Sequence, residues 1–267
     1  MNALSFIEIK EKFNSIKYNY RIGRGDIINV ILDNLDTWSL KFLYAVSLFT
    51  GPVSRKTLIK ITNCVESEIE KSDHEFEKLY FFDDYLKKNE VVENGEKIIT
   101  YYISSKEMEY TLKTLKSRIN GYNSLINNWI NYYKEFTNEE AKKLDYDLLI
   151  LSKIKKEFNT ISNVLNYCSS HKKFEDYYDI SNNIWYFCEL TNKNLDDYHY
   201  KRFEIALEIG DKKKIFESAL HYCNNAYKLI NKKWKKENFV NCLKEIESKK
   251  EHIKTVSYRL YLKYLYT

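Results

Sequence analysis

Glycine and proline are scarce in this chain, which has six Gly and a single Pro in 267 residues. Typical usage is about 7% and about 5%. Because tight turns between strands depend on these two residues, their scarcity disfavours a large sheet with many strands. It predicts helices joined by short polar turns, and therefore a mostly α protein. The length exceeds the ~100–200 residues of one typical domain, so we expect more than one.

Long apolar runs are also missing. No stretch approaches the ~18 apolar residues of a membrane span, and the first twenty residues carry a charge every few positions, unlike a signal peptide. The five cysteines form no Cys-x-x-Cys pair, and an odd number at irregular spacing fits buried, reduced thiols better than a disulfide framework. We therefore expect a soluble, cytoplasmic protein without a membrane partner.

Patterns that carry catalysis or bind metal are absent from the sequence as well. Cys168 and His171 have half of a zinc-site spacing, but no second Cys/His pair completes four ligands. The remaining histidines have no Ser or Cys nucleophile in a recognisable turn nearby. None of the six glycines is followed by Lys, so the phosphate-binding loop G-x-x-x-x-G-K-[ST] is missing. We expect no catalytic residues, no metal and no cofactor.

The only proline marks a corner between two predicted helices. Residues 37–49, TWSLKFLYAVSLF, have the pattern of a largely buried helix. Gly51 is placed to end that helix, and Pro52 cannot extend it. Ser54 then predicts an N-cap for a second helix, RKTLIKIT, over residues 55–62. The buried side of that helix is expected to hold Leu58, Ile59 and Ile61.

After this corner the periodicity changes from helical to alternating. A third helical pattern runs from Val65 to Tyr80, and two β-runs, 86–92 and 97–103, then flank Asn94-Gly95. Asn-Gly between alternating runs is the strongest short-range hairpin signal.

Three helices followed by a hairpin is the order of a winged helix, which we place at residues 36–118 after an N-terminal helical segment, 1–35. The third helix of a DNA-binding winged helix faces the duplex, but here it is rich in Glu and Asp. The pattern therefore favours a winged helix that packs against protein.

Residues 119–267 are predicted to form a series of consecutive helices. One long helix is expected to run to about Phe136, followed by a short polar link. Phe187-Cys188 recurs 35 residues later as Tyr222-Cys223. A large apolar residue followed by a small one recurs at spacings of 38 and 36 residues, at Leu165/Cys168, Phe203/Ala206 and Phe239/Cys242. These periods are close to the ~34 residues of a tetratricopeptide repeat (TPR) and predict a TPR-like solenoid.

Positive charge gathers near the end of the chain. Residues 1–200 carry 27 Lys and Arg against 30 Asp and Glu, whereas residues 201–267 carry 16 against 8. The last segment, EHIKTVSYRLYLKYLYT, is also apolar enough to need a neighbour. We therefore predict a partner-binding surface formed by Lys232, Lys233, Lys235, Lys236, Arg259, Leu260, Tyr261 and Tyr264.

The phrases LKFLYAVSLFTGPVSRKTLIKIT and YLKKNEVVENGEKIITYYISSKEMEYTL resemble the winged-helix domain of bacterial STAND signalling NTPases of the NB-ARC type. The helical segments that follow resemble the tetratricopeptide repeats of the same family, so the resemblance covers residues ~30–260. Two features depart from it. Ser104 and Ser105 stand where many members carry a histidine that contacts ADP, and the nucleotide-binding domain is absent. The resemblance implies a role in regulation or anti-phage defence.

The leading interpretation is a non-enzymatic adaptor or sensor that acts by protein–protein interaction, with a separate STAND NTPase or a second copy of the chain as its partner. Two alternatives stay open. One is a transcription regulator that binds nucleic acid through the winged helix or the basic C-terminal helices. The other is a fragment of a full STAND NTPase.

Overall fold

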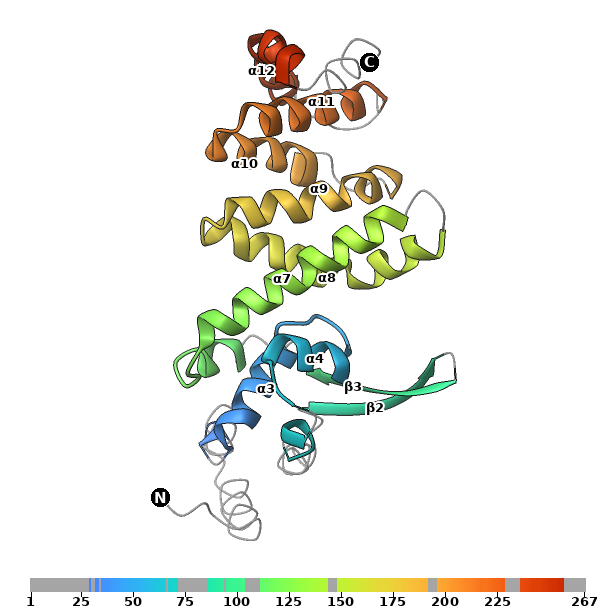
Figure 1. Ribbon diagram of the computed structural model, residues 1–267, viewed down its shortest axis with the longest axis vertical. Coiled ribbons are helices and arrows are strands. Elements are labelled where there is room, and N and C mark those ends of the chain that lie inside the picture. The colour runs from blue at the N-terminus through green and yellow to red at the C-terminus, as the bar shows by residue number, and fades with distance from the viewer. Residues whose placement is uncertain are drawn as a thin grey trace, which may run out of the picture. The chain divides into compact units, whose positions relative to one another are not determined.

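The computed structural model describes residues 29, 32–33, 35–65, 67–71, 86–93, 95–103, 111–143, 148–191, 196–228 and 236–256. This part of the chain is mostly helical and contains a small three-stranded sheet, which confirms the mostly α prediction (Figure 1). The chain divides into two compact units, Met1–Tyr132 and Tyr133–Thr267. The domain limits expected at 35/36 and 118/119 stay predictions. Among the described helices, none combines the length and the apolar character that a membrane span requires.

Helix α3 (Thr37–Ser47) forms much of the core of the first unit. Its N-terminus is capped by Asp36, whose Oδ1 accepts the Ser39 amide at 2.7 Å. Its end differs from the prediction. The amides of Leu48 and Phe49 already donate to carbonyls of the last turn, at 3.2 and 3.1 Å, so the helix closes before Gly51. Gly51 does not have a positive φ either. The expectation that Gly51 ends this helix is therefore wrong.

Helix α4 (Arg55–Thr62) begins where the sequence predicts. The Thr57 amide donates to Ser54 Oγ at 3.1 Å, which confirms Ser54 as the N-cap. Leu58 and Ile61 are buried as expected, whereas Ile59 is only half-buried. The local signals at this helix therefore agree with its structure.

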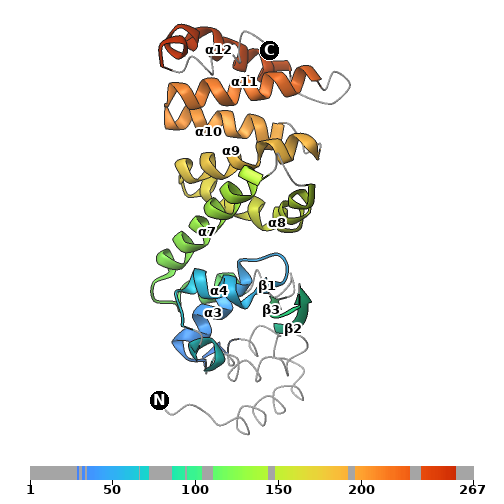
Figure 2. The same cartoon turned by 45° about the vertical axis from the view of Figure 1, so that its right-hand side comes forward.

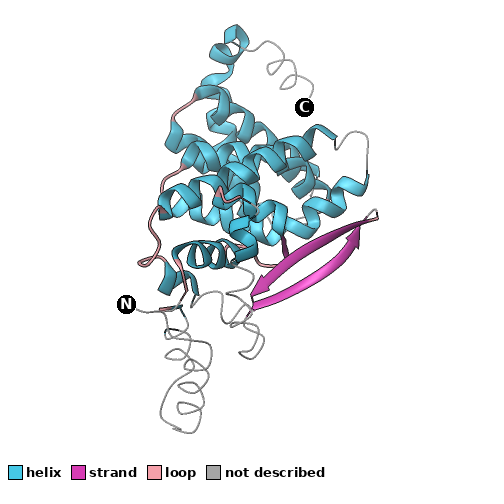
Figure 3. Ribbon diagram, turned by 60° about the horizontal axis from the view of Figure 1, so that its bottom comes forward, coloured by secondary structure: helices cyan, strands magenta, loops and turns pink. Residues whose placement is uncertain are grey.

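The sheet has the order β1-β3-β2, with both neighbouring pairs antiparallel. Strand β1 (Val53–Ser54) is short, and β2 (Leu86–Glu93) and β3 (Glu96–Ile103) form the long hairpin in Figure 3. Because Glu93 lies opposite Glu96, two residues make the turn, and Gly95 has a φ of +82°. The predicted hairpin is confirmed. Asn94, and the third predicted helix beyond residue 71, lie outside the described residues.

The second unit is a stack of helices, drawn from α8 to α12 in Figure 2. The elements are α8 (Leu148–Ser170), α9 (Phe174–Leu190), the π-helical turn η1 (Asp196–Tyr200), α10 (Lys201–Ile209), α11 (Lys212–Lys228) and α12 (Lys236–Val256). The unit also takes the C-terminal part of α7 (Tyr122–Lys143). The expected helix end near Phe136 is wrong, because the following residues TNEEAKK continue α7 for two more turns.

Side chains in the second unit also link helices that are not nearest neighbours along the chain. On one side, Lys134 of α7 pairs with α9, and Lys214 of α11 pairs with α9. On the other side, the hydroxyls of Ser162 in α8 and Tyr198 in η1 lie 3.3 Å apart. The Asn241 amide of α12 donates to the Tyr200 hydroxyl at 3.5 Å. Contacts beyond the nearest neighbour therefore join α7, α9 and α11 on one side, and α8, η1 and α12 on the other.

The residues of the predicted repeat pattern are packed in the second unit. Most of them are buried, and Phe239 is half-buried. All five cysteines lie in the described residues, and each is buried, which confirms the expected burial, whereas their reduced state stays a prediction. Small buried side chains let neighbouring helices approach closely, so the repeated positions serve packing.

Candidate binding surface in the helical unit

The partner-binding residues predicted from the sequence are not brought together by the described structure. Lys236 is exposed and begins α12. The other seven residues of that set lie outside the described part of the chain: Lys232, Lys233, Lys235, Arg259, Leu260, Tyr261 and Tyr264. A surface built from them therefore stays a prediction.

Cys168 and His171, which have half of a zinc-site spacing, lie in the environments of a packed core residue and a surface residue, respectively. Cys168 is buried, and burial raises the pKa of its thiol to about 12. The exposed His171 ring stacks on Tyr167 with a centroid distance of 3.8 Å. Across the described ranges, no group of three or more His, Cys, Asp or Glu side chains is arranged to hold a metal ion.

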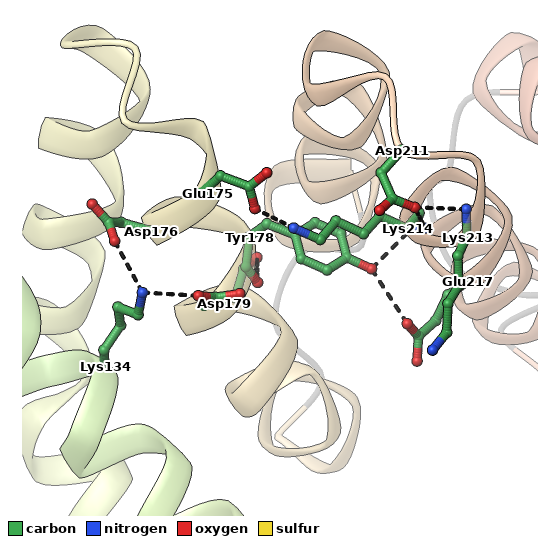
Figure 4. A network of polar contacts seen from close by, with 10 residues as sticks. Lys134, Glu175, Asp176, Tyr178, Asp179, Asp211, Lys213, Lys214 and Glu217 are labelled. Atoms are coloured by element: carbon green, nitrogen blue, oxygen red, sulfur yellow. Dashed lines mark hydrogen bonds and ion pairs between the residues drawn. The ribbon is translucent and has the colours of Figure 1, made fainter.

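A network of ion pairs crosses α7, α9 and α11 (Figure 4). Lys134 Nζ lies 3.1 Å from Asp176 Oδ1 and 2.9 Å from Asp179 Oδ2, and these contacts, led by the hydrogen bond with Asp179, raise its pKa. Lys214 pairs with Glu175 and lies 5.1 Å from the centre of the Tyr178 ring. Because these charged groups already have protein partners, we assign the network to stabilising the helix stack.

A buried cation lies within electrostatic reach of Tyr178 and Glu217. Arg202 of α10 is 1% exposed, and its guanidinium donates to Asn182 Oδ1 at 3.3 Å and to His221 Nδ1 at 2.7 Å. His221 stacks on Trp185 with a centroid distance of 4.3 Å. Because its Nδ1 accepts this bond, the neutral His221 ring carries its proton on Nε2. Burial lowers the pKa of Arg202, while attraction to nearby groups that include Glu217 opposes that effect.

The cation also acts on a second buried histidine. His199 of η1 is 2% exposed, and burial, together with the charge of Arg202, lowers its pKa to about 3. His199 is therefore neutral at physiological pH. His199 is thus unsuited to exchange protons near pH 7.

A polar pocket opens on the side of the unit formed by α8 and η1. Its volume is about 450 Å³, within the range of ligand sites, ~300–1,000 Å³. Residues of α8, α9, η1 and α10 line it: Ser162, Leu165, Asn166, Ser169, Tyr177, Asp197, Tyr198 and Lys201. All of them except Leu165 have a side chain that can form hydrogen bonds.

Tyr177 is the most deeply buried polar residue of this pocket. Its side chain is 4% exposed, and its hydroxyl has no hydrogen-bond partner among the described residues. Burial raises the pKa of this phenol, so the hydroxyl keeps its proton and remains a donor. The side chains of Asn166 and Ser169, and the exposed carboxylate of Asp197, likewise lack a partner in the described part of the chain.

The π-helical turn η1 positions one wall of the pocket. A π turn is wider than an α turn, and such turns occur often at functional sites. Here it supplies Asp197 and Tyr198, and the first residue of α10 adds Lys201. The sequence analysis did not predict these pocket residues, because the Tyr and Ser positions also fit the core pattern of a helix. The one available signal was the polar stripe at Ser162, Asn166 and Ser169.

Comparison with known protein families, with curated proteins and with solved structures gives no match for this chain.

Proposed function

We propose that the protein is a non-enzymatic adaptor or sensor that acts by protein–protein interaction. Its first unit would be a winged-helix module and its second a TPR-like solenoid. The observation that carries the proposal is the pocket of the helical unit, where the largely buried residue Tyr177 has a hydroxyl without a partner among the described residues. Polar groups held on rigid helices and left unpaired are suited to receive a ligand.

The order of elements in the first unit supports the winged-helix part of the proposal. Strand β1 lies between α3 and α4 in the chain and pairs with β3, so that Val53 is opposite Tyr101. The Tyr101 ring is buried and meets Phe42 of α3 edge-on, with a centroid distance of 5.0 Å. A hairpin anchored by a short strand between two helices is the arrangement that the proposal requires.

The alternating contacts of the second unit support the solenoid part. A solenoid of helix pairs places every second helix on the same side. The pairing of Lys134 with Asp176 across α7 and α9, and of Ser162 with Tyr198 across α8 and η1, follows that rule. Stacks of this kind present extended surfaces to partners, and in the proposed solenoid the pocket would belong to such a surface.

The chemistry of the buried groups supports a role without catalysis. The thiol of Cys168 has its pKa raised to about 12, so its nucleophilic thiolate form is negligible at pH 7. His199, with its pKa lowered to about 3, is a poor general base near neutral pH. We extend the proposal to the partner: a separately encoded STAND NTPase in a signalling or anti-phage defence system, which rests on the family resemblance alone.

Isolation of the partner tests this function. The full chain, tagged and expressed in its native cells, should copurify with one dominant protein. That protein, once purified, should bind the chain with a Kd near or below about 1 μM, equivalent to about −8 kcal/mol. A chain that binds no protein but shifts duplex DNA, with an affinity that falls steeply with salt, would instead support the transcription-regulator alternative.

A further inference from the structure

The pocket between α8, α9, η1 and α10 has features that specify its ligand. We propose that it binds an extended peptide segment that carries an Arg or Lys side chain. The inference rests on the proposed function, because it names the part of a protein partner that the helical unit would recognise.

The shape of the polar lining favours an extended chain. Ser162, Asn166 and Ser169 occupy successive turns of α8 and all line the pocket. At ~1.5 Å per residue they form a track about 10 Å long, which matches about three residues of extended peptide at ~3.3 Å each. The Asn166 amide both donates and accepts hydrogen bonds, as a peptide unit does. A linear ligand with repeating amides therefore fits this track.

Tyr177 supplies a donor for a peptide carbonyl. Its residue is 4% exposed and lines the pocket, and its hydroxyl has no partner among the described residues and is not one of their solvent-shielded unpaired atoms. A ligand oxygen can therefore replace solvent at this hydroxyl without breaking a hydrogen bond within the protein. Tyr177 also lies within the electrostatic influence of Arg202. A nearby buried cation favours an acceptor oxygen, such as a backbone carbonyl, over another donor at this position.

The charge at the pocket favours a basic side chain. Lys201 also lines the pocket, and its Nζ lies 3.1 Å from Glu204 Oε2, so part of its charge is offset within α10. Asp197 is exposed, lines the pocket and has no ion-pair partner among the described residues. The carboxylate of Asp197 is therefore the charge available to a ligand. An Arg side chain would satisfy it with two parallel hydrogen bonds, and a Lys side chain with one.

Selection from a phage-displayed octapeptide library on the full chain tests the inference. Peptides selected on the wild type are expected to contain Arg or Lys at one position, and the best of them is then synthesised with a fluorescent label. In anisotropy titrations, Asp197→Asn should weaken this peptide about tenfold, and should not weaken the same peptide with Ala at the basic position. Glu208→Gln, which neutralises an exposed carboxylate of α10 outside the pocket, should leave both affinities unchanged.

Two further variants test the backbone contacts. Tyr177→Phe keeps the ring and should weaken both peptides about threefold to tenfold, as expected for one lost hydrogen bond. Asn166→Ala, at an exposed position of α8, should have a similar effect and keeps the test valid if the Tyr177 variant does not fold. The matched control is Tyr178→Phe, which removes a hydroxyl directed at Lys214 and Glu217 instead.

The outcomes separate this inference from the adaptor function. Selected peptides without a basic residue, an empty selection, or binding that is unaffected by Asn166→Ala and Tyr177→Phe would overturn the inference. If the purified partner still binds these variants with wild-type affinity, the adaptor function stands and the pocket is not its site. If peptides bind as expected but no protein partner is found, the pocket assignment stands and the adaptor function fails.

Discussion

Single residues in the helical unit carry the clearest electrostatic consequences. His199 and Arg202 are both buried, and the histidine is held neutral in part by the neighbouring guanidinium. Asn182 and His221 accept hydrogen bonds from the terminal nitrogens of Arg202, which offsets part of the cost of burying this cation, whereas its buried Nε has no hydrogen-bond partner among the described residues. A buried histidine of this kind makes the free energy of unfolding depend on pH, because its pKa is lowered in the folded protein and not in the unfolded chain.

The first prediction concerns acid sensitivity. In the unfolded chain a histidine takes up a proton below its usual pKa of ~6.5, whereas folded His199 does so only near about 3. The unfolded state therefore binds more protons between these values, and the free energy of unfolding falls as pH falls through this window. From pH 7 to pH 5 we expect His199 to contribute a loss of about 2 kcal/mol.

Urea unfolding at a series of pH values measures this effect. His199→Gln should flatten the pH dependence over that window, whereas His252→Gln, at an exposed position of α12, should leave it unchanged. Equal slopes for the wild type and His199→Gln would show that His199 is not the group responsible.

At the scale of single elements, the helix ends and turns follow local chemistry with one exception. Ser54 caps α4, Gly95 supplies the positive φ of the hairpin, and Gly210 ends α10 with a φ of +79°. Gly51 is the exception, because backbone hydrogen bonds of Leu48 and Phe49 close α3 before it. Two glycines that look alike in the sequence therefore have different conformational requirements.

This difference predicts opposite effects of the same substitution. Gly51 has an ordinary φ, and an added Cβ would meet no atom within 4 Å. Gly51→Ala should therefore leave stability unchanged or raise it by about 0.5 kcal/mol, because it restricts the unfolded chain. Gly210→Ala should lower stability by about 1 kcal/mol, because alanine is strained at a left-handed helix end. Thermal unfolding of the two variants checks this, and a loss at Gly51 as large as that at Gly210 would contradict it.

The N-cap of α4 gives a third prediction. Ser54→Ala removes the oxygen that accepts the Thr57 amide and should lower stability by about 1 kcal/mol. Ser54→Asp retains a side-chain acceptor and should restore most of the loss, since Asp is also a favourable N-cap. Chemical denaturation measures both. If Asp were as destabilising as Ala, the cap would not be the source of the stability.

At the scale of the whole molecule, two compact units share helix α7. Its N-terminal part belongs to the first unit, where Asn128 donates to the Ile61 carbonyl at 3.0 Å. Its C-terminal part belongs to the second unit, where Lys134 pairs with α9. In the proposed function, each unit would offer its own surface to a partner.

The fourth prediction applies to the entire chain. Since no glycine is followed by lysine, the sequence has no phosphate-binding loop of the P-loop type. We expect isothermal titration calorimetry with ATP and Mg²⁺ to show no binding, and the purified chain to release no phosphate from ATP. Micromolar binding of ATP would contradict this prediction, and release of phosphate from ATP by the chain would overturn the proposed non-enzymatic role.

Features set by neighbouring residues could be predicted from the sequence. The helical class, the N-cap at Ser54 and the hairpin around Gly95 depend on side chains within a few positions of one another. Such short-range preferences act before any tertiary contact and are visible in the order of residue types. The burial of the repeated small residues was also apparent, because their spacing follows the period of packed helices.

The tertiary structure alone decided the candidate site. The sequence pattern predicts Tyr177 as a core aromatic, and only the approach of η1 to α8 makes it line a pocket together with Asp197. The lowered pKa of His199 likewise depends on burial and on Arg202. These results could not be predicted from the sequence. The burial of a side chain, and whether it finds a hydrogen-bond partner, depend on which other helices pack around it.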